Sequence, residues 1–212
     1  MTVQMQANKA FDAQDIERLV QDHQVHRDVY TSQDVYALEM QHLFANVWVF
    51  VGHDSQTPKR GDYFTTQIGS QPVIQVRHSD GAIKVLHNRC PHKGTKIAID
   101  RHGNTGTIFR CPYHAWSFET DGRLKAVPLD SGYADTTFGR TENANGIKPV
   151  GAVHNHRGFV FARLADSGIS FEDFFGDSLS SIDNMVDRSP EGRLEVAGPP
   201  LRLSLIHISE PT

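Results

Sequence analysis

Four residues of the types that bind iron or zinc stand in two short motifs. One residue separates Cys90 from His92 and two separate Cys111 from His114, which gives the spacing C-x-H-x18-C-x2-H. Each motif therefore supplies one thiolate and one imidazole. A [2Fe–2S] cluster in which two histidines replace two cysteines on one iron needs this set of ligands. We predict that Cys90 and Cys111 bind one iron and that His92 and His114 bind the other.

The residues around the candidate ligands favour short, rigid loops. Pro91 and Pro112 restrict the backbone after each cysteine, and Gly94 permits close approach of the backbone to the sulfur atoms. Strand-like stretches precede both motifs and another follows the second. Such support matters because hydrogen bonds and burial around a cluster set its potential. Trp116 fits the core, and in that position it can also shield the cluster from water.

Two other uses of these four side chains compete with the cluster. A structural zinc ion also accepts two cysteines and two histidines, but common zinc motifs pair like residues with like. Cys90 and Cys111 are the only cysteines, and a disulfide between them is disfavoured if the chain is cytoplasmic. A zinc-stabilised interaction module is the alternative that remains.

Composition narrows the range of functions. The chain has 212 residues, a net charge of −4, 38% hydrophobic and 22% charged residues, and a pI near 6.3. These values are typical of a globular protein and indicate neither nucleic-acid nor membrane binding. Residues 1–30 contain no apolar run that would serve as a secretory signal or a membrane span. We therefore expect a cytoplasmic protein.

A series of strands surrounds the two motifs. Alternating or continuous apolar stretches rich in Val, Ile, Phe and Tyr predict strands at 48–52, 62–69, 72–77, 83–88 and 158–164. Asp80-Gly81 and Asp121-Gly122 predict hairpin turns, the second between 116–118 and 124–127. The fold class expected is α+β, with an antiparallel β domain flanked by helices.

Helices are predicted on both sides of the strands. Residues 11–22 favour a short polar helix, and Thr31 with Asp34 favours the capped start of a second. Ser170 and Asp173 favour another helical stretch that ends near Val186, and a strand is expected at 193–197. One face of the second helix should pack on the core through Tyr36, Met40, Leu43, Phe44 and Val47.

Beyond the motifs themselves, the sequence resembles the large (α) subunit of the Rieske non-haem iron aromatic ring-hydroxylating oxygenases. The resemblance rests on CPHKG and CPYHAW, and on LFANVWVFVGH, GDYFTTQIGSQPVIQVRHSDG and TDGRLKAVP. It covers roughly residues 30–202. Respiratory Rieske proteins carry an extra cysteine in each loop and a serine after the second motif. Here Thr95, Tyr113 and Trp116 occupy those positions, which implies no bridge between the loops and a lower potential.

The resemblance implies a route for electrons. A ferredoxin or an NAD(P)H-dependent reductase, or both, would reduce the Rieske [2Fe–2S] cluster. The cluster would pass the electrons to a mononuclear Fe(II) site that activates O₂ and oxidises an aromatic substrate. The segments CPHKGTKIAID and GDYFTTQIG resemble α subunits that act on aromatic carboxylates. The family also implies a homotrimer or an α3β3 assembly, in which the exposed edges of His92 and His114 face the neighbouring subunit.

The same resemblance divides the chain into four parts and leaves one part of the enzyme out. These parts are an N-terminal helical segment (1–46), a Rieske domain (47–166), the start of a truncated catalytic domain (167–202), and a tail (203–212) that reads like a translated sequencing adapter. The 2-His-1-carboxylate iron site of the family is not encoded, so this chain alone is expected to be inactive as an oxygenase. A stand-alone Rieske electron carrier is the second hypothesis.

Two further groups of residues have both plain and functional interpretations. Five basic residues near the motifs form either a solvated surface or a docking face for an acidic electron carrier: Lys93, Lys96, Arg101, Arg123 and Lys125. His154 and His156 resemble a metal chelate by composition, but an exposed turn is expected there instead.

Overall fold

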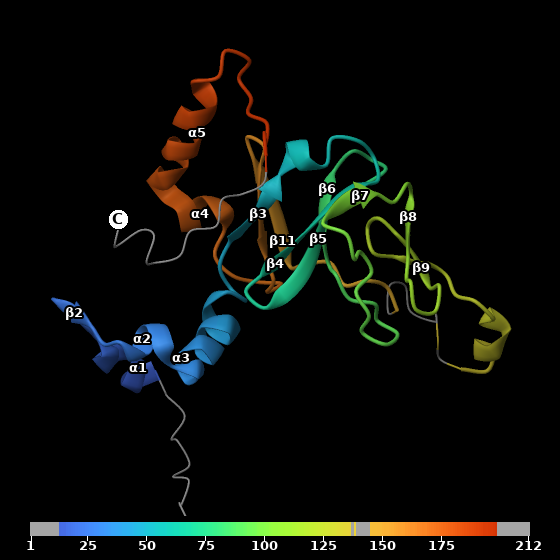
Figure 1. Ribbon diagram of the computed structural model, residues 1–212, viewed down its shortest axis with the longest axis horizontal. Helices are drawn as coiled ribbons and strands as arrows, with labels where there is room; N and C mark the ends of the chain where they lie inside the picture. Colours follow the sequence, from blue (N-terminus) through green and yellow to red (C-terminus); the bar gives the residue numbers. More distant parts are fainter. Residues whose placement is uncertain (1–12, 137, 139–144, 199–212) are drawn as a thin grey trace, which may run out of the picture.

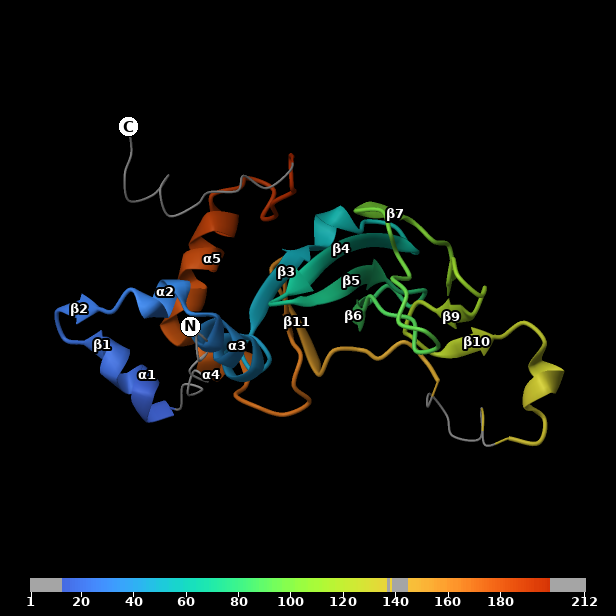
Figure 2. The ribbon, with the colours of Figure 1, turned by 60° about the horizontal axis from the view of Figure 1, so that its bottom comes forward.

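The computed structural model describes residues 13–136, 138 and 145–198. The molecule is elongated, with helices from both ends of the chain on one side and the loops around the second cysteine on the other (Figures 1 and 2). The tail expected at 203–212 lies outside the described residues.

A four-stranded antiparallel sheet occupies the centre of the molecule, in the order β6-β5-β4-β7. The strands are β4 (Asp62–Ile68), β5 (Gln71–Arg77), β6 (Ile83–His87) and β7 (His102–Asn104). The predicted turn at Asp80-Gly81 joins β5 to β6, where the Gly81 N–H donates to the carbonyl of His78 at 2.9 Å. These strand predictions are confirmed, and β7 is the one strand of this sheet that the sequence interpretation missed.

Two three-stranded antiparallel sheets flank the central one. The first has the order β11-β12-β3 and consists of β3 (Val49–His53), β11 (Ala152–His156) and β12 (Phe159–Arg163). The second has the order β10-β9-β8 and consists of β8 (Ile108–Arg110), β9 (Ser117–Glu119) and β10 (Leu124–Ala126). The predicted hairpin at Asp121-Gly122 is confirmed between β9 and β10.

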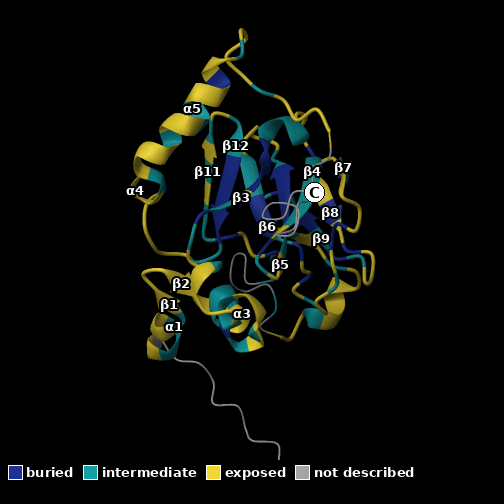
Figure 3. Ribbon diagram, turned by 60° about the vertical axis from the view of Figure 1, so that its left-hand side comes forward, coloured by how far each residue is buried: buried dark blue, intermediate teal, exposed yellow. Residues whose placement is uncertain are grey.

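Strand β5 contributes to both apolar cores of the β region. Val73 belongs to the core shared with the β11-β12-β3 sheet, whereas Ile74 and Val76 belong to the core that also contains the two cysteines. Successive strand residues point to opposite faces, so the nearly continuous apolar run in β5 is buried on both sides. Each such side chain contributes roughly 1.5–3 kcal/mol on burial. Figure 3 shows the buried residues gathered in the strands.

The N-terminal region is a chain of short elements. Helix α1 (Ala13–Leu19) confirms the first predicted helix in part, and a small hairpin of β1 (Val20–Gln21) and β2 (Gln24–Val25) follows it. Helix α2 (Asp28–Thr31) then leads to α3 (Gln33–Leu38) and the π-helical turn η1 (Glu39–Leu43).

The predicted start of the second helix is wrong by one residue. Ser32, not Thr31, caps α3, because its backbone is extended and its side chain accepts a hydrogen bond from the Val35 N–H. Thr31 still belongs to α2, where its hydroxyl donates to the carbonyl of Arg27 at 3.2 Å.

The predicted buried face of this helix is also partly wrong. Tyr36 and Leu43 are 50% and 46% exposed, whereas Val35 is 3% exposed. The regular spacing behind the prediction assumes one continuous α-helix. The chain instead passes into a π-helical turn after Leu38, which rotates the later residues relative to the earlier ones.

Helices α4 (Phe171–Phe175) and α5 (Leu179–Asp187) cover the outer face of the β11-β12-β3 sheet, with the 3-10 turn η4 (Gly176–Ser178) between them. The predicted cap is confirmed, because the Ser170 hydroxyl accepts from the Asp173 N–H at 3.0 Å. Phe171 packs under the helices against Trp48 and Phe161.

Two other predictions for the C-terminal half are wrong. Residues 193–197 form no strand, because no described strand lies beside them to complete a ladder. His154 and His156 lie in strand β11 rather than in a turn. His154 stacks on Phe171 with ring centroids 3.8 Å apart, and His156 Nε2 lies 2.8 Å from Asp183 Oδ1 on α5. Both rings therefore contribute contacts that hold α4 and α5 against the sheet.

Within the described part of the chain, no helix is long and apolar enough to cross a membrane.

Candidate iron–sulfur site

Two loops carry the four candidate ligands, and both have the same backbone hydrogen bonds. In the first loop, which follows β6, the Cys90 N–H donates to the Thr95 carbonyl at 2.8 Å and the Gly94 N–H donates to the Cys90 carbonyl at 2.9 Å. In the second loop, between β8 and β9, the Cys111 N–H donates to the carbonyl of Trp116 at 2.8 Å. The Ala115 N–H donates to the Cys111 carbonyl at 3.0 Å. Each cysteine thus opens a closed turn of the same size.

The fourth residue after each cysteine has a left-handed backbone. Gly94 has φ 77°, and the equivalent Ala115 has φ 58°. A positive φ is favourable for glycine and costly for other residues. Glycine at position 94 indicates a loop with an unusual backbone in the sequence. The left-handed backbone at Ala115 was missed, because alanine does not indicate a positive φ.

The two thiols are buried and unbridged at the base of the loops. Cys90 and Cys111 are each 2% exposed and neither is in a disulfide. Burial raises the pKa of the Cys90 thiol; the backbone N–H of His92 opposes this shift and the neighbouring Cys111 thiol adds to it. The sulfur atoms therefore face each other in an apolar site, as two ligands of one metal atom would.

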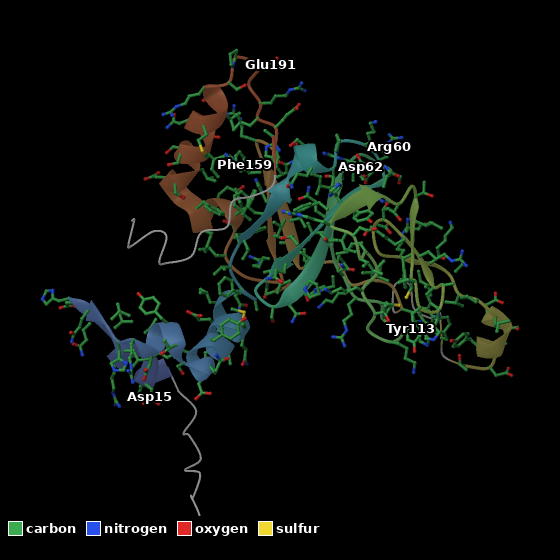
Figure 4. The ribbon with its side chains drawn as sticks, in the orientation of Figure 1. Asp15, Arg60, Asp62, Tyr113, Phe159 and Glu191 are labelled. Atoms are coloured by element: carbon green, nitrogen blue, oxygen red, sulfur yellow. The ribbon has the colours of Figure 1, made fainter. Side chains whose placement is uncertain are left out.

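The two histidines lie together nearer the surface. The ring centroids of His92 and His114 are 4.7 Å apart. His92 Nδ1 is buried without any hydrogen-bond partner, while His114 is exposed. Burial, His114 and Lys93 lower the pKa of His92 and so favour the neutral imidazole, which is the form that binds metal. Tyr113, which Figure 4 labels, lies in the second loop directly before His114.

The donor set fits a cluster of two irons better than one metal ion. A buried, unpartnered imidazole nitrogen is costly unless something binds it. Within the described residues, no three His, Cys, Asp or Glu side chains converge on one point as the ligands of a single zinc ion would. In a [2Fe–2S] cluster each iron takes only two protein side chains, so two separate pairs are the expected arrangement.

Comparisons with known proteins agree with this geometry. Residues 47–137 match the family model of the Rieske [2Fe–2S] domain. The chain is 37% identical over 172 residues to the α subunit of toluate 1,2-dioxygenase from Pseudomonas putida, a match that covers 80% of this chain and 37% of that protein. Over 153 residues it is 39% identical to the oxygenase subunit of glycine betaine monooxygenase from Chromohalobacter salexigens, covering 72% and 33%.

Among solved structures, naphthalene 1,2-dioxygenase from Rhodococcus sp. bound to indole superposes with a TM-score of 0.76 at 31% identity, covering 89% of this chain and 41% of that one. The chain therefore contains a Rieske [2Fe–2S] domain, and over most of its length it is similar to the α subunits of Rieske non-haem iron oxygenases. It spans just over a third of the length of the toluate dioxygenase relative.

A buried amide side chain, that of Asn88, supports the first of the two loops. The Asn88 side chain donates to the Ala98 carbonyl at 2.7 Å and accepts from the Ile97 and Ala98 N–H groups at 2.8 and 3.0 Å. It therefore ties the end of β6 to the segment that leaves the loop. The sequence interpretation treated Asn88 as the last residue of a strand. The sequence signal that could have identified its role is an amide residue standing two positions before the first candidate ligand, Cys90.

The basic residues near the loops fall into two groups. Arg123 pairs with Glu119 and Asp121 at 2.6 and 2.8 Å, and Lys125 pairs with Glu119 at 3.0 Å. These two cations are therefore largely neutralised. Lys93, Lys96 and Arg101 are exposed and have no ion pair within the described residues. Of these five residues, Lys93, Lys96 and Arg101 are the ones that can add net positive charge to the surface near the loops.

Proposed function

We propose that Cys90 and Cys111 bind one iron of the Rieske cluster, that His92 and His114 bind the other, and that the chain passes electrons through this site. The observation that carries the proposal is the buried, unpartnered Nδ1 of His92 beside two buried, unbridged thiols. We further propose residues 47–166 as the cluster-binding domain, with residues 1–46 as a helical segment and 167–202 as the beginning of a catalytic domain.

The four proposed ligands lie at different depths in the protein. Cys90 and Cys111 hold the inner side, where burial excludes water. His92 and His114 hold the outer side, where His114 is exposed. When bound, the cluster supplies one-electron transfer. The shared turn geometry keeps the four donor atoms in place during that change of charge, so little reorganisation is needed.

For the whole protein we propose the reaction that the family resemblance implies. Electrons from NAD(P)H would arrive through a reductase, a ferredoxin or both, and a mononuclear Fe(II) would supply the activation of O₂ needed to oxidise an aromatic substrate. The toluate dioxygenase relative favours an aromatic carboxylate, whereas the glycine betaine relative favours a monooxygenase acting on a quaternary ammonium compound. A homotrimer or an α3β3 assembly would bring His114 to the neighbouring subunit, and NAD(P)H as electron donor favours the cytoplasm.

Spectroscopy of the chain expressed and purified without oxygen tests the cluster. We expect iron and sulfide in equal amounts and, on reduction, an EPR signal with average g below the free-electron value, as histidine-ligated clusters give. His92→Ala and Cys111→Ser should abolish the signal, whereas His154→Ala, which removes a histidine distant in sequence from the loops, should leave it intact. Stoichiometric zinc without iron would refute the proposal and support the zinc-stabilised module.

A second experiment separates an oxygenase component from a stand-alone carrier. If the chain acts within a Rieske oxygenase, the open reading frame beyond residue 202 should continue into a segment with two histidines and a carboxylate. Product formation with O₂ should then require that segment. A reading frame that ends at this point, together with reversible reduction of the chain by a reductase alone, would favour the carrier.

We also propose that Lys93, Lys96 and Arg101 form the docking surface for an acidic electron donor. Two charge reversals, Lys93→Glu with Lys96→Glu, should slow reduction by the donor roughly tenfold at low salt and flatten its salt dependence. Lys125→Glu is the matched control, since Lys125 is already paired with Glu119. Equal effects of the double variant and the control would contradict a specific surface.

A further inference from the structure

Trp116 lies flat against one of the two histidines. The rings of Trp116 and His92 are parallel within 2°, with centroids 4.8 Å apart. His92 and His114 meet at 65°, so the second histidine does not share this stack. Trp116 belongs to the second loop and His92 to the first. The contact therefore joins the two halves of the site.

Trp116 is itself held firmly. Its side chain is 6% exposed and its backbone carbonyl accepts from the Cys111 N–H. Phe138 packs on it edge-on with centroids 5.3 Å apart, and Phe118 lies 6.4 Å away. An indole fixed on several sides provides a rigid plane for the imidazole that rests on it.

The His92 ring has no hydrogen-bond partner among the described residues. Metal-binding histidines usually donate their second ring N–H to a carboxylate or a carbonyl, which fixes the ring orientation. No hydrogen bond to the His92 ring occurs within the described part of the chain, and its Nδ1 is buried and unpartnered. Of the two ring contacts that His92 makes, the parallel stack on Trp116 is the one made to a buried side chain, and it constrains which way Nδ1 points.

We propose that Trp116 is a positioning residue that orients His92 toward the cluster from within this chain. This inference rests on the proposed ligand set and adds to it a difference between the two histidines. His114 is exposed and stacks at 3.8 Å on Tyr113, which is itself 63% exposed. The orientation of His92 depends on the core, whereas that of His114 depends on a surface contact.

The test compares Trp116→Phe, which retains an aromatic plane, with Trp116→Met, which fills much of the space without one. Phe118→Leu is the control, because it disturbs the same core while leaving the stack. The readouts are the nitrogen hyperfine couplings of the two coordinated histidines in the reduced cluster, and the rate of cluster loss to a chelator.

For Trp116→Met we expect one of the two nitrogen couplings to change and the cluster to be lost roughly 10–100-fold faster, as for loss of an outer contact to a metal-binding histidine. Trp116→Phe and Phe118→Leu should retain both couplings. Unchanged couplings in Trp116→Met, or a Trp116→Phe variant that folds but has altered couplings, would overturn the inference. If Trp116→Met does not fold, the Trp116→Phe couplings decide. A wild-type chain without a cluster would instead overturn the proposed function.

Discussion

Replacing Ala115 with glycine should stabilise the protein, although most substitutions beside a metal site do the opposite. Ala115 has φ 58°, in the left-handed region that costs an L-residue roughly 1–2 kcal/mol. Glycine avoids that cost, but it loses about 0.5–1 kcal/mol more backbone entropy on folding. The difference predicts a net gain of about 0.5–1 kcal/mol. The equivalent residue of the first loop, Gly94, is already a glycine.

A matched control has the opposite expected sign. Ala126 is exposed in strand β10, close in sequence to the same loop, and its φ is not positive. Ala126→Gly should cost roughly 0.5–1 kcal/mol, because glycine gains nothing in a strand. Both variants remove one methyl group from the same small domain, so the comparison isolates the backbone conformation.

The assay is the thermal midpoint of the cluster-loaded chain, followed by circular dichroism under anaerobic conditions. A change of 1 kcal/mol shifts the midpoint by about 2–4 °C for a chain of this size. The visible spectrum of the cluster should be the same in both variants. An Ala115→Gly midpoint that falls by as much as the Ala126→Gly midpoint would refute the reasoning about the loop backbone.

Three further predictions concern the core, the surface charges and a helix cap. Leu86→Ala should cost roughly 2–5 kcal/mol in denaturant unfolding, because Leu86 is fully buried, whereas Ile99→Ala should change stability by less than about 0.5 kcal/mol, since Ile99 is 73% exposed. Burial alone would raise the pKa of Asp121, but the N–H and guanidinium groups of Arg123 outweigh it and lower the pKa. A lowered folded-state pKa stabilises the protein above the unfolded value of about 3.9 and loses that effect as pH falls through the folded value. Asp121→Asn should therefore be less stable at pH 7 by at most about 1 kcal/mol, with the gap closing below about pH 4; a gap that widens in acid would contradict the assignment. Ser170→Ala should cost about 1 kcal/mol, seen as faster hydrogen exchange in the first turn of α4, and unchanged exchange there would argue against the cap.

The features that the sequence determined by itself are local ones. The turn at Asp80-Gly81 needs residues that accept unusual backbone angles, and the run in β5 needs two apolar faces, so both are legible in a short window. The C-x-H and C-x2-H motifs are similarly short. Their chemistry follows from residue type and spacing, and the Rieske family model matches the segment that contains them.

The features that only the tertiary structure decided depend on what lies opposite each residue. Tyr36 is exposed because a π-helical turn changes the direction of the helix, and His156 is in a strand because β12 pairs with it. Lys125 adds little net positive charge to the proposed docking surface, because it forms an ion pair with Glu119 of the neighbouring strand. None of these neighbours is encoded by the spacing of the residue concerned.

The candidate site shows the same division within a few residues. The identity of the four proposed ligands can be predicted from sequence, because metal chemistry selects cysteine and histidine whatever the fold. The parallel contact between Trp116 and His92 cannot, because it joins two loops that are distant in the chain. Ligand type is a local property, whereas ligand orientation depends on packing between segments that only folding brings together.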